Sequence, residues 1–234
     1  MPFKQRNPEG DFARLNELIE QYCSPEWRQL MRERNGVMEF RKGETIFSQG
    51  QVAEHMFMIE HGKAKVEVSF NKDASRIVRL AGDGDVLGHR GIGNSLVYSA
   101  SGVALTEITV NYIPMGLFLS VLKANNLFCY HFLLFFAEEL RRADHQLRDL
   151  RNMTVQQRVA KALKMNLDAF GTDPKDPRKL AFTLSRKDIA NIADTTYESV
   201  IRTLAEFQRQ GIIELYGKEI RLLRRKELLD AMVG

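Results

Sequence analysis

The stretch Thr183-Leu-Ser-Arg-Lys-Asp-Ile-Ala-Asn-Ile-Ala-Asp-Thr-Thr-Tyr-Glu-Ser-Val-Ile-Arg202 carries the signals of two short helices joined by a tight turn. Ser185 can cap the first helix, and Asp188 stands three residues later, as in a capping box. Asp194 tolerates the left-handed backbone that a tight turn requires. The stretch therefore predicts a helix, a turn and the start of a second helix.

The second helix has its own start and stop signals. Thr195 or Thr196 can cap its first turn, the helix is expected to run to about Gln210, and Gly211 can end it. Two helices joined in this way form a helix-turn-helix. The segments 212–215 and 219–223, joined by a turn at 216–218, predict a hairpin, and the unit is then of the winged type.

The first residues of the second helix are the candidates for reading DNA. In such a unit they face base edges in the major groove, where Arg pairs with guanine and Glu accepts from cytosine. The predicted DNA-contacting residues of the whole unit are Arg186, Thr196, Tyr197, Glu198, Ser199, Ile201, Arg202 and Lys218. Spacing leaves two structural alternatives open for Glu198: a capping box with Thr195 and a helical ion pair with Arg202.

Net charge supports this location for a polyanion site. Residues 1–152 hold 19 Lys and Arg against 19 Asp and Glu, and residues 153–234 hold 15 against 11, so the excess of +4 lies in the last third. A neutral first part joined to a basic last part is typical of a nucleic-acid-binding module attached to another domain.

The rest of the composition excludes several classes of protein. With 234 residues, 44% of them hydrophobic, the chain is long enough for two globular domains. Its first residues, MPFKQRNPEGDF, lack the apolar core of a secretory signal, and no stretch approaches the roughly 18 apolar residues of a membrane span. We therefore expect a cytoplasmic protein with no membrane partner.

Cys23 and Cys129 are too few for a disulfide framework or a four-thiolate site, and we expect both thiols to be buried.

Ahead of the winged unit, the sequence changes from helical to strand-like texture and back. Residues 11–34 predict two short helices, and residues 37–113 consist of short apolar runs divided by glycines. The glycines at 43, 50, 62, 82, 84 and 88 are expected to take a positive φ in tight turns. This part predicts an antiparallel barrel or jelly roll.

A long helix is expected to start near Asn125. Its apolar residues recur at spacings of 4 and 3, a heptad seam made of Cys129, Leu133, Phe136, Leu140, Ala143, Leu147 and Leu150. A period of 3.5 favours a partner helix, most simply the same helix of a second copy. Phe132, Leu134 and Phe135 keep open the alternative that the first half packs only on its own barrel. The first alternative makes the chain a homodimer, with Leu133, Phe136, Leu140, Ala143, Leu147 and Leu150 in the interface.

The order of these parts resembles the CRP/FNR (cyclic-AMP receptor protein/fumarate-nitrate regulator) family along nearly the whole chain. The resemblance is carried by Lys42-Gly-Glu-Thr-Ile-Phe-Ser-Gln-Gly50, Met58-Ile-Glu-His-Gly-Lys-Ala-Lys-Val66, Gly84-Asp-Val-Leu-Gly88 and the helix-turn-helix. It implies an α+β fold with a cyclic-nucleotide-binding-like β jelly-roll barrel (1–124), a dimerisation helix (125–152) and a winged helix-turn-helix (153–234). It also implies a transcription regulator, not an enzyme, that binds a pseudo-palindromic operator and, if it is an activator, RNA polymerase.

For Glu198, the resemblance favours a base contact over the capping box and the helical ion pair. In the family the recognition-helix Glu and the Arg four residues later contact bases, and Glu198 and Arg202 occupy these positions. The position before the Glu is Arg in the cyclic-AMP receptor branch and is Tyr197 here, so the operator is not expected to match that branch in full.

The sensor end departs further from the cyclic-AMP branch. That branch has a carboxylate for the ribose and an arginine for the cyclic phosphate, but the matching stretches here read Gly88-His89-Arg90-Gly91 and Ser99-Ala100-Ser101. The dimer helix offers Ala143 and Asp144 where the branch offers Thr-Ser. The candidate effector pocket is therefore Gly88, His89, Arg90, Ser99, Ala100, Ala143 and Asp144. Arg90 could serve an anion, or it could stand in a plain surface turn.

No cofactor is expected from these residues. The chain lacks the arginine that would pair with the phosphate of cyclic AMP. Two thiols cannot build the iron–sulfur cluster of the oxygen-sensing branch. His89 has no second ligand at a recognisable spacing for haem or a metal ion. The sequence thus predicts a homodimeric DNA-binding regulator controlled by an unidentified effector or by none. The alternative is a small-molecule receptor that signals through protein contacts without specific DNA binding.

Overall fold

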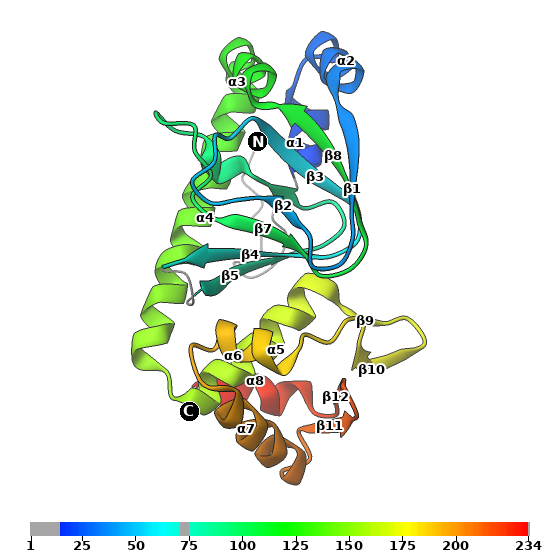
Figure 1. Ribbon diagram of the computed structural model, residues 1–234, viewed down its shortest axis with the longest axis vertical. Helices are drawn as coiled ribbons and strands as arrows, with labels where there is room; N and C mark the ends of the chain where they lie inside the picture. Colours follow the sequence, from blue (N-terminus) through cyan, green and yellow to red (C-terminus); the bar gives the residue numbers. More distant parts are fainter. Residues whose placement is uncertain (1–14, 71–74, 234) are drawn as a thin grey trace, which may run out of the picture.

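The computed structural model describes residues 15–70 and 75–233, without the side chains of Asn16, Leu150 and Val233. A β-barrel forms one end of the molecule and a mostly helical unit forms the other. A single long helix, α4 (Asn126–Asn152), runs down the side of the barrel to the C-terminal unit (Figure 1). The three parts follow the order expected from the sequence.

The barrel consists of two four-stranded antiparallel sheets. One has the order β1-β8-β3-β6 and the other the order β2-β7-β4-β5. The first contains Gly36–Phe40 (β1), Ile108–Pro114 (β8), His55–His61 (β3) and Val86–Leu87 (β6); the second contains Thr45–Phe47 (β2), Ser101–Ala104 (β7), Ala64–Ser69 (β4) and Ser75–Ala81 (β5). Met56, Ile59 and Val110 are buried between the sheets. The predicted jelly roll is confirmed.

Five of the six turn glycines have the expected positive φ, and Gly82 does not. A Cβ on Gly82 would lie 3.2 Å from the carbonyl oxygen of Ala169, which belongs to the C-terminal unit. The positive φ expected for Gly82 was therefore wrong. This glycine instead lets a helix of the C-terminal unit approach the barrel closely.

Helices cover the far end of the barrel. The two expected N-terminal helices are α1 (Leu15–Tyr22) and α2 (Pro25–Arg34), and residues 11–14 of the predicted segment lie outside the described residues. A helix that the sequence analysis did not predict, α3 (Met115–Ala124), follows β8 directly. A short 3₁₀ turn, η1 (His89–Gly91), sits between β6 and β7 and faces α4.

The C-terminal unit surrounds the helix-turn-helix with a small sheet. Its helices are α5 (Val155–Phe170), α6 (Arg186–Ile192), α7 (Tyr197–Arg209) and α8 (Arg225–Val233). The sheet has the order β11-β12-β10-β9, with strands Ile213–Tyr216 (β11), Glu219–Leu222 (β12), Asp176–Leu180 (β10) and Thr172–Asp173 (β9). The wing hairpin β11-β12 is confirmed, whereas β9, β10 and α8 were not predicted.

Candidate nucleic-acid interface

The helix-turn-helix formed by α6 and α7, which we call the reader, has helices that begin and end on local signals. Ser185 caps α6, because its hydroxyl accepts a hydrogen bond from the Asp188 backbone N–H at 3.0 Å. Asp194 has a φ of 49°, which makes the tight turn between the helices. Thr196 caps α7 by accepting from the Ser199 N–H at 3.2 Å, and Gly211 follows its end with a φ of 70°. The caps therefore fix where the recognition helix starts.

Neither structural alternative for Glu198 is formed. The cap belongs to Thr196, so the capping box between Thr195 and Glu198 was the wrong reading. Within residues 15–70 and 75–233, the Glu198 carboxylate makes no ion pair or side-chain hydrogen bond, and Arg202 donates instead to the Ser199 hydroxyl at 3.2 Å. Both side chains are exposed. Their charged groups are available to a molecule outside the chain.

The recognition helix divides into a buried face and an exposed face. Val200, Leu204 and Phe207 are at most 1% exposed and pack in the C-terminal core. On the other side, Tyr197 is 46% exposed and Ile201 is 41% exposed, one turn apart. Together with Thr196, Ser199, Glu198 and Arg202 they form what we call the reading face. Apolar atoms on such a face can contact thymine methyl groups, while the charged ends reach base edges.

Arg186 and Lys218 lie beside the reading face, but they differ in availability. Arg186, at the start of α6, is half-buried and donates to the backbone oxygen of Lys218 at 3.2 Å. This bond fastens the wing to the helix-turn-helix. The Lys218 side chain is exposed at the tip of the β11-β12 hairpin, where its ammonium is free to approach a phosphate.

Arg158, which the sequence analysis did not single out, holds the turn of the reader in place. Its guanidinium donates to the carbonyl oxygen of Ala193 at 2.7 Å, to that of Asp194 at 3.3 Å and to that of Met153 at 2.9 Å. Arg158 thereby connects the end of α4, the start of α5 and the α6–α7 turn. Its partners lie as far as 36 residues away, so no local pattern could have identified it.

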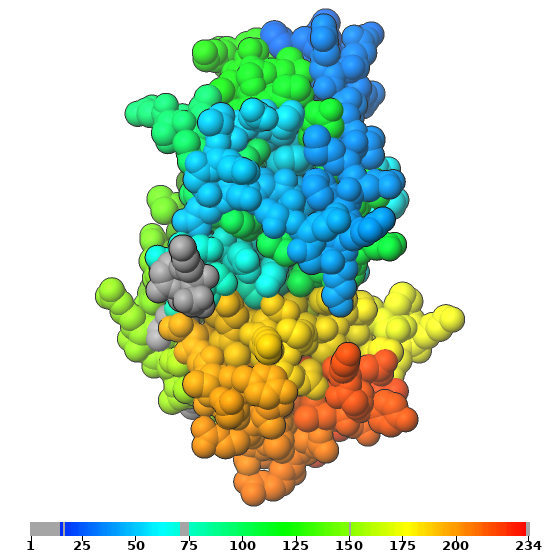
Figure 2. All heavy atoms as spheres, in the orientation of Figure 1, coloured from blue at the N-terminus to red at the C-terminus, as the bar shows by residue number. Residues whose placement is uncertain are grey.

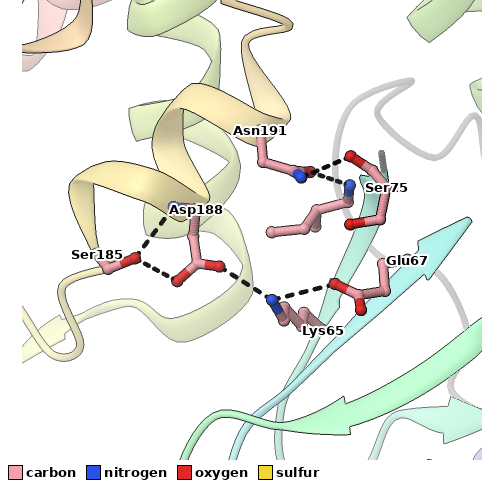
Figure 3. A network of polar contacts seen from close by, with 7 residues as sticks. Lys65, Glu67, Ser75, Ser185, Asp188 and Asn191 are labelled. Carbon is pink, nitrogen blue, oxygen red and sulfur yellow. Dashed lines mark hydrogen bonds and ion pairs between the residues drawn. The ribbon is translucent and has the colours of Figure 1, made fainter. Parts of the chain in front are cut away.

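The reader is docked on the barrel through polar contacts between α6 and the strands β4 and β5 (Figure 3). Lys65 on β4 contacts Asp188 on α6 at 3.1 Å and Glu67 at 3.1 Å. The Asn191 side chain pairs with the backbone of β5: its oxygen accepts from the Ile77 N–H, and its amide donates to the Ser75 oxygen at 2.7 Å. We call these residues the latch.

An ion pair between Arg76 on β5 and Asp194 extends the latch to the α6–α7 turn, at 3.0 Å. In the space-filling view, the yellow and orange atoms of the C-terminal unit meet the blue and green atoms of the barrel along a broad front (Figure 2). The orientation of the recognition helix is thus set by contacts that the barrel makes with its neighbouring helix.

The candidate effector residues His89 and Arg90 both contact Glu139 on α4. His89 Nε2 lies 3.4 Å from Oε2 of Glu139, and the guanidinium of Arg90 lies 3.0 Å from the same oxygen. His89 is 3% exposed and Glu139 is 6% exposed. The carboxylate of Glu139 therefore takes the position on Arg90 that an external anion would need.

The charges in this cluster are fixed by opposing effects. Burial by itself raises the pKa of Glu139, but the hydrogen bond from His89 and the positive charge of Arg79 outweigh it and hold the pKa at about 2. Burial lowers the pKa of His89 below its usual 6.5, so the ring is neutral near pH 7 and donates from one nitrogen. The Nδ1 atom of His89 is buried without a hydrogen-bond partner among the described residues.

The other candidate pocket residues are spread out. Gly88 is buried with a φ of 80°, Ser99 is exposed, and Ala100 is buried in the barrel. Ala143 is half-buried and Asp144 is exposed on α4. Of this predicted set, Arg90 and Ala143 line a common cavity, and no contact recorded for the described residues joins Ser99 to Asp144.

The expected dimer seam on α4 is part exposed and part buried. Leu133, Leu140 and Leu147, spaced by seven residues, are 64%, 65% and 58% exposed. Phe136 packs instead against the barrel core and the ring of His89, and Ala143 is half-buried; the Leu150 side chain lies outside the described residues. The barrel-packing alternative holds for Phe132 and Phe135, whereas Leu134 is 47% exposed. The exposed leucines form one apolar stripe, which we call the seam.

The remaining sequence expectations concern thiols, metals and membranes. Cys23 is buried as expected, but Cys129 is exposed on α4, so that expectation was wrong. Within the described part of the chain, no group of three or more His, Cys, Asp or Glu residues is placed to hold a metal ion. No single described helix is long and apolar enough to cross a membrane; α3 and α4 satisfy the length and composition together only as a pair bent by 114°.

Comparison with known families divides the chain at the same place as the fold does. Residues 37–125 match the model of the cyclic nucleotide-binding domain, and residues 157–231 match the model of the Crp-like helix-turn-helix domain. The first range covers the barrel and α3, and the second covers most of the C-terminal unit.

Relatives and solved structures extend the match along the chain. The CRP-like cAMP-activated global transcriptional regulator of Mycobacterium tuberculosis is 26% identical over 78% of this chain and 82% of its own. The nitrogen fixation regulation protein FixK of Azorhizobium caulinodans is 29% identical over 81% of this chain and 76% of its own. The structure of FixK2 from Bradyrhizobium japonicum has the same fold, with a TM-score of 0.75 at 22% identity over 84% of this chain and 96% of that one. The chain belongs to the CRP/FNR family of DNA-binding transcription regulators.

Proposed function

We propose that the chain acts as a homodimer that reads a two-fold symmetric DNA site through Glu198 and Arg202. The observation that carries this proposal is the state of these two side chains. Both are exposed at the start of the recognition helix, and the described structure gives the Glu198 carboxylate no partner within the chain. Arg at such a position can pair with guanine and Glu with cytosine N4.

Neighbouring groups are suited to hold the DNA backbone. Thr196 and Ser199 present hydroxyls, and Lys218 presents an ammonium from the wing. Contacts of this kind set register and orientation but do not select sequence. Arg186 contributes chiefly through the wing, since its guanidinium is engaged with the Lys218 backbone. Tyr197 and Ile201 supply the apolar contacts of the reading face.

The seam supports a second copy as the partner. Three exposed leucines at heptad spacing on a 27-residue helix would bury their side chains against the same helix of another chain. Two parallel copies place two recognition helices on one duplex, in major grooves about 34 Å apart. The operator then shares the two-fold symmetry of the protein.

We propose that cyclic AMP is not the signal, although one relative is named as cAMP-activated. A cyclic phosphate at Arg90 would meet the ionised carboxylate of Glu139, which already pairs with that arginine. Like charges at close range in a buried site oppose each other strongly. We likewise propose that no iron–sulfur cluster or haem is used, that an activating role would involve contact with RNA polymerase, and that the chain is no enzyme.

The direct test compares Arg202→Ala with Arg209→Ala, two arginines on one helix. Arg209 lies at the exposed far end of α7 and pairs with Glu206. On a mapped operator, Arg202→Ala should lose roughly 1–3 kcal/mol of discrimination at one base step in each half-site. Arg209→Ala should retain the wild-type preference. Competition binding against single-base variants of the operator measures both.

Two results would contradict the proposal. If Arg202→Ala keeps the wild-type base preference, the assigned reading residue is wrong. If the wild-type chain shows no preference for any genomic fragment at physiological salt, the alternative of a receptor that signals through protein contacts is favoured instead.

A further inference from the structure

A cavity of about 200 Å³ lies where the barrel, α4 and the C-terminal unit meet. Strand β5 contributes Ile77 and Val78 to its wall, and α4 contributes Leu147. Met165 on α5 and Ile192 on α6 close it from the C-terminal unit. A molecule in this cavity would touch all three parts of the chain through a mostly apolar wall.

The wall also carries an excess of positive charge. Arg76, Arg90, Arg158 and Lys161 line the cavity, together with one carboxylate, Asp149. Three of the four cations are paired with backbone carbonyl oxygens or with carboxylates that are at most 33% exposed. Arg158 donates to backbone carbonyl oxygens, Arg90 pairs with Glu139, and Lys161 pairs with Asp149.

Among the cations that line the cavity, Arg76 has the most exposed carboxylate partner. Its ion pair goes to Asp194, whose side chain is 64% exposed, so solvent weakens that bond. Because Arg76 also lines the cavity, its guanidinium can turn from Asp194 toward an anion placed there.

We propose that this cavity binds a small carboxylic acid with an aromatic or short aliphatic body. The carboxylate pairs with Arg76, and the body lies among Ile77, Val78 and Met165. The volume sets the size class: drug-sized ligands need about 300–1000 Å³, whereas a cavity of roughly 150 Å³ holds a benzene ring. Because Leu147 also belongs to the seam, a second copy packed along α4 would close the cavity on that side.

The site adjoins the latch, which gives binding a consequence. A carboxylate that draws Arg76 away from Asp194 removes one of the contacts between β5 and the α6–α7 turn. A ligand that prefers one docked arrangement shifts the population toward it, and DNA then affects ligand affinity by the same factor. This coupling rests on the proposed function, whereas the binding itself does not.

The experiment uses 4-fluorobenzoate as the probe and 4-fluorobenzamide as its neutral counterpart of equal size. Each is titrated against the full chain without DNA, and the fluorine NMR signal is followed. The benzoate should bind saturably and the benzamide at least tenfold more weakly. Arg76→Gln should weaken benzoate binding at least tenfold. Arg221→Gln, the matched control, removes a wing arginine that also pairs with partly exposed carboxylates, and should bind as the wild type does.

A second variant tests the apolar part of the site. Val78→Phe fills the cavity and should abolish binding, with circular dichroism melting to verify the fold; if it does not fold, Arg76→Gln decides. The inference is overturned if the wild type binds no benzoate saturably, if the benzamide binds equally well, or if Arg76→Gln has no effect. Since no DNA is present, these results are independent of whether Glu198 and Arg202 read bases.

Discussion

Glu139 is the residue through which α4 holds the sensor turn of the barrel. One oxygen of its carboxylate, Oε2, faces both His89 and Arg90, and the residue is 6% exposed. Removing the charge leaves these two donors and the nearby Arg79 without their anion. A hydrogen bond to a charged group contributes about 1.5–3 kcal/mol, so Glu139→Gln should lower the free energy of unfolding by that order.

Chemical denaturation at neutral pH measures this loss, with Glu138→Gln as the control. Glu138 lies next to it on α4 and pairs with Arg141, which is 66% exposed, so its replacement should cost at most about 1 kcal/mol. Equal effects of the two substitutions would show that the Glu139 cluster does not support the fold.

The lowered pKa of Glu139 also sets a pH window. A carboxyl group whose pKa falls from 4.5 to about 2 on folding stabilises the fold above pH 4.5, and this contribution is lost as the pH falls toward 2. The stability difference between wild type and Glu139→Gln should therefore narrow between pH 4.5 and 2. A difference that is constant across that range would contradict the ionised, buried state of Glu139.

At the residue scale, local chemistry was predictable and long-range partners were not. Ser185 and Asp194 act within a few residues of themselves, and the sequence indicated their roles. The cap of α7 stayed ambiguous because two threonines adjoin each other, and the backbone geometry selects Thr196. Glu139 and Asn191 have partners 50 and 114 residues away, so only the folded chain brings them to their sites.

Among the elements, α4 has two functions along its length. Its first half packs Phe132 and Phe135 onto the barrel, while Leu133, Leu140 and Leu147 remain exposed as the seam. A heptad pattern in the sequence predicted a helix and a partner, but it could not say which apolar residues the barrel itself would cover. Phe136 fits the heptad and nevertheless packs inward against His89.

The seam leads to a prediction about assembly. Leu140→Glu places a charge in the middle of the expected two-helix interface, where a second copy carries the same charge. This variant should sediment as a monomer at concentrations where the wild type is a dimer. Leu229→Glu on α8 is the matched control, since Leu229 is 42% exposed but lies outside the seam. If Leu140→Glu remains dimeric, the interface lies elsewhere.

The elements that sequence analysis missed lack local signals. The strand β10 contains Pro177 and pairs with β12, about 40 residues away, so its conformation depends on the wing already being in place. The helix α3 follows directly on β8 with Pro114 as its N-cap and no side-chain cap hydrogen bond. Tertiary context decides both, and a propensity argument does not reach them.

At the scale of the whole molecule, the docking of the reader on the barrel was beyond the sequence. The latch joins α6 to the strands β4 and β5, which lie more than 100 residues earlier in the chain. Asn191 is the most informative residue of the latch, because its side-chain amide makes the two hydrogen bonds to the β5 backbone that a neighbouring strand would otherwise make. The barrel can thus influence the recognition helix without touching it.

Asn191→Ala tests the latch. The substitution removes two hydrogen bonds to the backbone of β5, each contributing about 0.5–1.5 kcal/mol. The Ile77 amide, which donates to Asn191, should then exchange its hydrogen with solvent roughly 5- to 150-fold faster. Lys187→Ala, on the same helix but exposed, should leave that rate unchanged. An unchanged rate in Asn191→Ala would mean that other contacts alone hold the reader on the barrel.

We propose that two copies of the chain read DNA with the starts of their α7 helices. The most direct measurement is the selection of binding sites from random duplexes by the full-length wild type, Glu198→Ala and Arg202→Ala. The wild type should select a two-fold symmetric site, with half-site centres about 10 base pairs apart. Each variant should lose preference at the same positions in both half-sites. An asymmetric site, or variants that select the wild-type site, would contradict this proposal.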